Sequence, residues 1–207
     1  MSMTNQPEKE NSFHEITKHL LEDEKPSIYL NSIWKESWFQ QFPFTMLYVL
    51  RGTKQSPIHH PEGDVWNHTL LVVDQAAKLK ESSKNPLVFM WAALLHDIGK
   101  PKTTRVKKGK ITAYNHDTVG EKLAIEFLEA CEKDSEFIEE VSNLIRYHMH
   151  ILFVVRNLPF ADKKGLLRKT DVREVALLGY CDRMGRTNQD ERKVREEVEQ
   201  FYHLMTK

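Results

Sequence analysis

Apolar residues recur along most of this chain with the spacing of buried helices. From Asp64 onward they lie almost all around a helix, and Asp64 is suited to cap that helix after the break at Gly63. The run Leu87–Leu95 is the longest apolar stretch of the chain. We expect it to form a second buried helix, which Gly99 and Pro101 should terminate.

Helical patterns continue on both sides of these two segments, with one exception. Between 103 and 114, β-branched residues flank the turn Lys107–Lys110, which predicts a small hairpin or an ordered loop. Residues 1–10 are polar and expected to be loose, whereas 12–50 hold short aromatic-rich helical patterns that should pack on the core. Further helices are expected over 117–131, 135–148, 161–169, 172–183 and 188–205. The predicted fold class is therefore all-α.

Composition narrows the function classes. The formal net charge of +0 argues against a nucleic-acid coat or a membrane-surface protein, although a local basic patch stays possible. Cys131 and Cys181 belong to no CxxC or Cys/His cluster, so we expect core thiols in a reducing compartment. The first ten residues have no apolar leader pattern, and no apolar run approaches the roughly 20 residues of a membrane helix. We expect a soluble, cytoplasmic protein with no membrane partner, and we infer no obligate protein partner.

Several of the 10 histidines lie on core-facing helix stripes. Apolar residues follow His116 at offsets of 3, 7 and 11, and precede His148 at offsets of 3, 4 and 7. On a continued helix, His150 would point about 200° away from His148. We therefore favour His148 as a site residue and place His150 at the rim. His68 lies inside the first buried helix.

Two carboxylates accompany these histidines. Asp182 lies on a largely inward stripe, where a carboxylate is costly unless it is paired or bound to a metal. The alternative to a metal is an ion pair with Arg183 or Arg186. His96 and Asp97 follow the apolar run, and adjacent residues on a helix point about 100° apart. Both side chains can therefore reach an ion that lies in the angle between them.

Together these side chains make a mixed nitrogen and oxygen ligand set without thiolate: His68, His96, Asp97 and Asp182. Such a set suits Mn, Fe, Co, Ni or Zn in an open catalytic site better than a closed structural zinc site, and Mg is also possible. His116 and His148 could hold a second ion, with Asp97 as the bridge. The sequence leaves one ion or two open.

Basic residues lie next to the expected site. Lys100 is a natural phosphate partner, although it could equally offset the dipole of a helix C-terminus. Six basic residues without an acid occupy positions 100–110, either as a phosphate-attracting loop or as a solvated hairpin. We assign substrate contacts to Lys100, Lys102, Arg183 and Arg186. The catalytic residues would be Lys100 and Asp97, which could orient the attacking water.

The order of these residues resembles the HD superfamily of metal-dependent phosphohydrolases. "HDIGK" (96–100) is a typical form of its central motif, and the histidines at 116 and 148 resemble its six-ligand, binuclear version. The chain is similar to the HD domain that follows the nucleotidyltransferase in some bacterial tRNA CCA-adding enzymes. The similar stretches are "HHPEGDVWNHTLLVVDQAA" (59–77), "ALLHDIGKPKTT" (93–104), "YNHDTVGEKLAIEFL" (114–128), "VSNLIRYHM" (141–149) and "LLGYCDRMGR" (177–186).

This resemblance implies an HD-type helical bundle over 57–187, with 1–56 as a helical extension packed on it and 188–207 as a C-terminal helix. It also implies phosphatase, nucleotidase or cyclic phosphodiesterase chemistry on phosphorylated small molecules, nucleotides or RNA phosphate ends, through a metal-activated water. We expect no CCA addition, because the 207 residues leave no room for a nucleotidyltransferase. The alternatives are a non-enzymatic module that binds a nucleotide or metal, and an RNA-binding accessory domain that uses the 100–110 loop.

Overall fold

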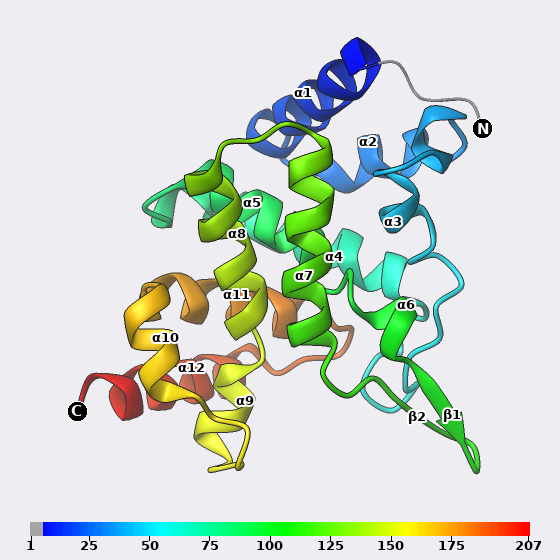
Figure 1. Ribbon diagram of the computed structural model, residues 1–207. Helices are drawn as coiled ribbons and strands as arrows, with labels where there is room; N and C mark the ends of the chain where they lie inside the picture. The colour runs from blue at the N-terminus through cyan, green and yellow to red at the C-terminus, as the bar shows by residue number, and fades with distance from the viewer. Residues whose placement is uncertain (1–5) are drawn as a thin grey trace.

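The computed structural model describes residues 6–207, which form a helical bundle with one small hairpin at its edge (Figure 1). Its elements in chain order are α1 (Gln6–Glu22), α2 (Pro26–Ile33), η1 (Trp38–Gln40), α3 (Thr45–Tyr48), α4 (Val65–Leu79), η2 (Lys80–Ser82), α5 (Pro86–Leu95), α6 (Lys100–Thr103), β1 (Arg105–Lys107), β2 (Lys110–Thr112), α7 (His116–Ala130), α8 (Ser135–Tyr147), α9 (His150–Val155), α10 (Lys163–Lys169), α11 (Val172–Met184) and α12 (Glu191–Thr206). The all-α prediction is confirmed.

Helix α5 is the centre of the bundle, and it contacts α1, α4, α8 and α11. Every side chain from Val88 to Leu95 is buried, as the apolar run predicts. The helix ends at Leu95, however, before the expected stop at Gly99 and Pro101. Pro101 instead lies in the first turn of α6, where its missing N–H has no helical partner to lose. The turn between α5 and α6 carries His96 and Asp97.

Helix α4 begins where the sequence predicts it. The side chain of Asp64 accepts a hydrogen bond from the backbone N–H of Asn67 at 3.0 Å, which satisfies one of the unpaired donors of the first turn. The other carboxylate oxygen of Asp64 accepts from the N–H of Gly52 at 2.8 Å. Asp64 therefore joins the first turn of α4 to the loop residue Gly52.

Helices α7 and α8 lie side by side in front of α5 (Figure 1). The start of α7 comes very close to the turn after α5, because Gly99 has no side chain. A Cβ atom on Gly99 would lie 2.1 Å from the carbonyl oxygen of His116 and 2.7 Å from the backbone nitrogen of Gly120. This close approach brings the first residue of α7 next to the residues that follow α5.

The N-terminal helices cover α4 and α5. Phe13 of α1 stacks on Trp91 of α5 with ring centroids 4.1 Å apart, and the indole N–H of Trp91 donates to Thr17 Oγ1 at 3.0 Å. Residues 6–10 belong to α1, so the expectation of a loose segment is wrong there, since the helix extends back from the apolar face that contains Phe13 and Ile16. The same expectation for residues 1–5 lies outside the described residues.

The predicted hairpin over 103–114 is confirmed. Val106 pairs with Ile111 in an antiparallel register, and the strands are joined by Lys108 and Gly109, whose φ angles of +49° and +75° suit a tight two-residue turn. The hairpin points away from the bundle (Figure 1).

The C-terminal helices begin slightly later than predicted. Asp162 caps α10 and Asp190 caps α12, so these helices begin at Lys163 and Glu191. Helix α9 was not expected, because its six residues are too few to show a helical period. Within residues 6–207, no helix combines the length and the apolar character needed to cross a lipid bilayer.

Candidate metal centre

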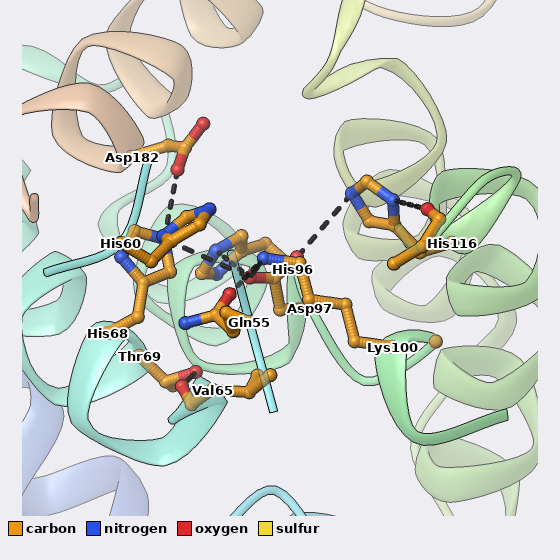
Figure 2. Close-up of polar contacts among 12 residues, drawn as sticks. Gln55, His60, Val65, His68, Thr69, His96, Asp97, Lys100, His116 and Asp182 are labelled. Carbon is orange, nitrogen blue, oxygen red and sulfur yellow. Dashed lines mark hydrogen bonds and ion pairs between the residues drawn. The ribbon is translucent and has the colours of Figure 1, made fainter. Parts of the chain in front are cut away.

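The structure brings the six predicted ligands together from five helices that are distant in the sequence. Figure 2 labels all of them except His148. All six side chains are buried. Most of them lie at helix ends: His96 and Asp97 follow α5, His116 begins α7, and His148 follows α8. The remaining two lie within helices, His68 in α4 and Asp182 in α11.

The ligand atoms form two groups. The first consists of His68, His96 and Asp182, and each residue offers one atom within 4.8 Å of the others. Its shortest contact joins Nε2 of His68 to Oδ1 of Asp182 at 3.0 Å. Two imidazoles and a carboxylate with this spacing are suited to hold a divalent transition metal.

The second group consists of Asp97, His116 and His148, again with atoms within 4.8 Å of one another. Nε2 of His116 lies 3.2 Å from Nε2 of His148 and 3.5 Å from Oδ1 of Asp97. The other oxygen of Asp97, Oδ2, lies 3.2 Å from Nε2 of His96. Asp97 therefore faces both groups with different oxygens, which is the arrangement of a bridging carboxylate, and Figure 2 shows it between His116 on one side and Asp182 on the other.

Three histidines are oriented by the backbone in the same way. Nδ1 of each lies within hydrogen-bond distance of the carbonyl oxygen three residues earlier: His96 to Ala93 at 2.9 Å, His116 to Ala113 at 2.6 Å and His148 to Ile145 at 2.6 Å. A carbonyl oxygen only accepts, so Nδ1 carries the proton and donates it. Nε2 of each neutral ring then directs its lone pair inward, as metal-binding histidines do. Nε2 of His96 is buried with no hydrogen-bond partner in the part of the chain described here.

The electrostatics of the centre match a cation site. Burial opposes ionisation of Asp97 and Asp182, but His96 and Lys100 near the former and Arg186 and His68 near the latter hold the pKa of each well below its usual value. Both carboxylates are therefore ionised at neutral pH.

The imidazoles of the centre differ from one another. Burial, together with His116 and His96, lowers the pKa of His148 to about 3, and burial also lowers the pKa of His116. These two rings are therefore neutral at neutral pH, as a metal ligand must be. The pKa of His96 is raised, because Asp97 outweighs the opposing effect of burial.

A cavity of about 170 Å³ opens beside the two groups. Asp97, His116, His148 and Asp182 line it together with residues 54–56, His59, His60 and the base of the hairpin. The ammonium of Lys100 reaches into this cavity, 2.6 Å from Oδ2 of Asp97 and 2.5 Å from Oε1 of Gln55. Lys100 begins α6, five residues beyond the last residue of α5, Leu95.

The two predicted arginines differ in their placement. Nη2 of Arg186 lies 3.1 and 3.3 Å from the two oxygens of Asp182, so the ion pair considered as an alternative for Asp182 is present, and Arg186 also lines the cavity. Arg183 points elsewhere, and its guanidinium donates to Oε2 of Glu197 and to the carbonyl of Gly179. It lines a neighbouring cavity of about 310 Å³, to which Asp182 and Arg186 also contribute.

Some placements differ from the sequence expectations. Lys102 is exposed and does not line the cavity. His150 is fully buried rather than at the rim, because it begins α9, and its Nε2 accepts a hydrogen bond from the N–H of Asp162 at 3.2 Å.

Three further polar residues at the centre were missed: Gln55, His60 and Glu62. His60 and Glu62 lie in "HHPEG", within the stretch that carries the resemblance, but this loop has no periodic pattern that would assign them a direction.

Comparison with known proteins identifies the family. The model of the HD domain matches residues 65–184. The Multifunctional CCA protein of Actinobacillus pleuropneumoniae serotype 5b is 37% identical over 101 residues, which are 49% of this chain and 24% of that protein. The Multifunctional CCA proteins of Hahella chejuensis and Pseudomonas fluorescens Pf0-1 are 31% identical over 134 residues and 32% identical over 142 residues, which are 65% and 68% of this chain and 30% and 32% of theirs.

This chain thus spans about a quarter to a third of the length of these curated relatives. The matched region contains all six buried residues of the two groups that could hold a metal ion. The chain belongs to the HD domain family.

Proposed function

We propose that this protein is a metal-dependent phosphohydrolase that acts on nucleotides or on nucleic-acid phosphate ends. The observation that carries the proposal is the pair of buried ligand groups on either side of Asp97. The HD domain is a superfamily of metal-dependent phosphohydrolases, and membership in it supports the same reading.

The residues fit one or two divalent ions. His68, His96 and Asp182 would hold one ion, His116 and His148 a second, and Asp97 would bridge them. When bound, such an ion supplies Lewis acidity to a phosphoryl oxygen and makes water acidic enough to act as a nucleophile near neutral pH. Nitrogen and carboxylate ligands without thiolate favour Mn, Fe, Co, Ni or Zn, and Mg is a further candidate.

Cationic side chains at the cavity are suited to a phosphate. Lys100 lies within the cavity with its ammonium close to Asp97, so a phosphate oxygen next to the ligand groups would also be within its reach. Arg186 also lines the cavity, next to Asp182. We propose that both cations neutralise charge on the transferred phosphoryl group. Asp97 would in addition accept a hydrogen bond from the attacking water and orient it.

The names of the relatives support a nucleotide or nucleic-acid substrate. These relatives are named Multifunctional CCA proteins, and this chain matches only a part of each. We propose that the shared part acts on a phosphorylated small molecule, a nucleotide or an RNA end, as a phosphatase, a nucleotidase or a cyclic phosphodiesterase. Lys102 and Arg183 stay in the proposal as candidates for contacts with a substrate that extends beyond the cavity.

Both cysteines are free and buried, which supports a reducing, cytoplasmic location.

The test combines metal content with turnover. Purified wild type and His96→Ala would be analysed for bound elements and assayed on a 2′,3′-cyclic nucleotide, on nucleoside monophosphates and on inorganic pyrophosphate. The expected result is one or two ions per chain together with hydrolysis in the wild type, and loss of hydrolysis and of the ion of the first group in His96→Ala. Ions without turnover on any of these compounds would favour the alternative of a non-enzymatic regulatory module. Failure to bind Mn²⁺ or Co²⁺ would overturn the proposal.

A further inference from the structure

Glu62 is a buried carboxylate next to the ligand groups that neither the HD motif nor the cavity cations explain. It lies in the loop before α4, and its side chain is only 2% exposed. Oε1 of Glu62 lies 3.0 Å from Nδ1 of His68 and 2.8 Å from Nδ1 of His60. Among the described residues, no lysine or arginine nitrogen lies within 4.0 Å of this carboxylate. A buried carboxylate whose nearest partners are two imidazoles is costly unless its position serves the site.

The backbone around Glu62 fixes where its carboxylate points. Gly63 adopts φ +112°, a conformation that L side chains rarely adopt. The carbonyl of Glu62 accepts a hydrogen bond from the side-chain amide of Asn67 at 3.3 Å. Because Asn67 also donates its backbone N–H to Asp64, the same residue ties Glu62 to the first turn of α4. The carboxylate is therefore held against the helix that carries His68.

His68 needs such a partner because it lacks the one that the other ligand histidines use. His96, His116 and His148 direct Nδ1 to the carbonyl oxygen three residues earlier. The corresponding carbonyl for His68 belongs to Val65, and it accepts a hydrogen bond from the hydroxyl of Thr69 at 2.9 Å (Figure 2). Nδ1 of His68 faces Glu62 instead. Oε1 of Glu62, 3.0 Å from Nδ1, thus lies where a backbone carbonyl oxygen lies at the other three rings.

We propose that Glu62 is the positioning residue of the first ligand group: it accepts the Nδ1 proton of His68 and so directs Nε2 of that ring toward His96 and Asp182. This inference rests on the proposed function, since it assumes that His68 binds a metal. A charged acceptor also makes the imidazole a stronger electron donor than a neutral carbonyl does. Removal of such outer partners lowers metal affinity by about 10–100-fold in other metal sites.

Glu62 contacts two histidines, His60 and His68, and only His68 belongs to the first ligand group. A variant of His60 is therefore the control for a variant of Glu62. His60 shares the same carboxylate oxygen but offers no atom to the first ligand group. If Glu62 acts through His68, then Glu62→Ala should weaken metal binding, whereas His60→Ala should not. Glu62→Gln keeps the shape and an acceptor oxygen but removes the charge, so its effect should be intermediate.

The experiment is a calorimetric titration of chelator-treated full-length protein with Mn²⁺, supported by the visible absorption spectrum of the Co²⁺ form and by circular dichroism as a check of folding. We expect the affinity for one ion to fall about 10–100-fold in Glu62→Ala, with a changed Co²⁺ spectrum, and to be unchanged in His60→Ala. If Glu62→Ala fails to fold, Glu62→Gln gives the same comparison with a smaller effect.

Two results would overturn the inference while leaving the proposed function in place. One is wild-type affinity in both Glu62 variants. The other is an equal loss in His60→Ala, which would mean that the carboxylate acts through His60. Absence of Mn²⁺ and Co²⁺ binding by the wild type would instead overturn the proposed function, and this inference with it.

Discussion

Nε2 of His116 lies 3.2 Å from Nε2 of His148, and neither ring has its proton on that nitrogen in the neutral state. Both rings donate Nδ1–H to a backbone carbonyl, at Ala113 and Ile145. Burial keeps the pKa of both below the usual value. Two lone pairs therefore face each other in a buried site, an arrangement that a cation between them stabilises.

Removing one of these rings should remove one ion and leave the other. We expect His148→Ala to contain about one ion fewer per chain than the wild type, because the group of His68, His96 and Asp182 is untouched. Elemental analysis after dialysis against Mn²⁺ measures this directly, with His203→Ala as a control from the exposed side of α12. Equal metal content in His148→Ala and the wild type would argue against a second ion.

Asp182 contacts both His68 and Arg186, so it can act as a metal ligand or as the partner of an ion pair. Variants of Asp182 and Arg186 distinguish these two roles. Asp182→Asn removes the charge that faces both His68 and Arg186, so we expect lower metal affinity if Asp182 is a ligand. Arg186→Met breaks only the ion pair, and we expect it to retain the ion while the KM for a phosphorylated substrate rises. Titration with Mn²⁺ and steady-state kinetics on both variants provide the comparison. Unchanged metal content in Asp182→Asn would reduce Asp182 to a partner of Arg186.

Lys100 should act on the substrate more than on the metal. We expect Lys100→Ala to raise KM for a phosphate ester by about 10-fold or more while metal content stays the same, because its ammonium lies at the cavity beside Asp97 but is not itself a metal ligand. Lys169→Ala, an exposed lysine at the end of α10, is the matched control for loss of one positive charge. A loss of metal in Lys100→Ala would show instead that the pair with Asp97 holds that carboxylate in place.

The metal-free protein should lose stability as the pH falls below about 6.5. Burial lowers the pKa of His60 and His150 to about 4 and that of His148 to about 3, so the unfolded chain binds more protons than the folded one between about 6.5 and 4. Stability therefore rises with pH in this window, by about 1–3 kcal/mol per pH unit. The raised pKa of His96 has the opposite sign, but it acts mainly above 6.5.

Urea denaturation of chelator-treated protein between pH 7.5 and 5.0 measures this dependence. A free energy of unfolding that is flat across the range would contradict the buried, neutral state of these three histidines.

Gly99→Ala should damage the second ligand group without touching a ligand. Its new Cβ would lie 2.1 Å from the carbonyl oxygen of His116, which belongs to the backbone and cannot rotate away. The start of α7 must shift, and we expect a loss of about 1–3 kcal/mol in stability together with weaker binding of one ion. Gly120→Ala on the facing helix is the milder comparison, because its Cβ would lie 3.2 Å from the Cγ2 atom of Ile145 and 3.6 Å from the backbone atoms of Gly99 and His96, which are tight or ordinary contacts rather than a clash. Thermal unfolding and Mn²⁺ titration of both variants test the difference.

The sequence predicts most of the bundle and six candidate ligands that the structure brings together, because the period of the apolar residues shows which face of a helix is buried. Stripes of apolar residues show which way His116 and His148 face, and a buried carboxylate such as Asp182 stands out on an inward stripe. These residues meet in the structure at the distances a metal needs. The exact end of α5 was less predictable, since the turn at His96 keeps helical backbone angles and leaves no sequence signal before Gly99.

Loops and long side chains were harder to predict. Glu62 and His60 lie in an irregular loop, where the direction of a side chain depends on tertiary contacts such as the bond from Asn67. Arg183 and Arg186 are three residues apart, yet they have different partners, because Glu197 of α12 attracts one and Asp182 the other. The sequence around α11 does not show where α12 packs, so the partner of Arg183 could not be predicted from it.

The ligand set is also a set of long-range connections. His68 and Asp182 are separated by 114 positions and His116 and His148 by 32, so an ion held by each pair would act as a reversible cross-link that closes large loops of the chain. Because such a cross-link exists only in the folded protein, every increment of metal affinity is also an increment of folding free energy. If the centre binds a metal as proposed, the lifetime of this protein against proteases should follow the supply of that metal, and a shortage of the ion would lower the amount of folded protein.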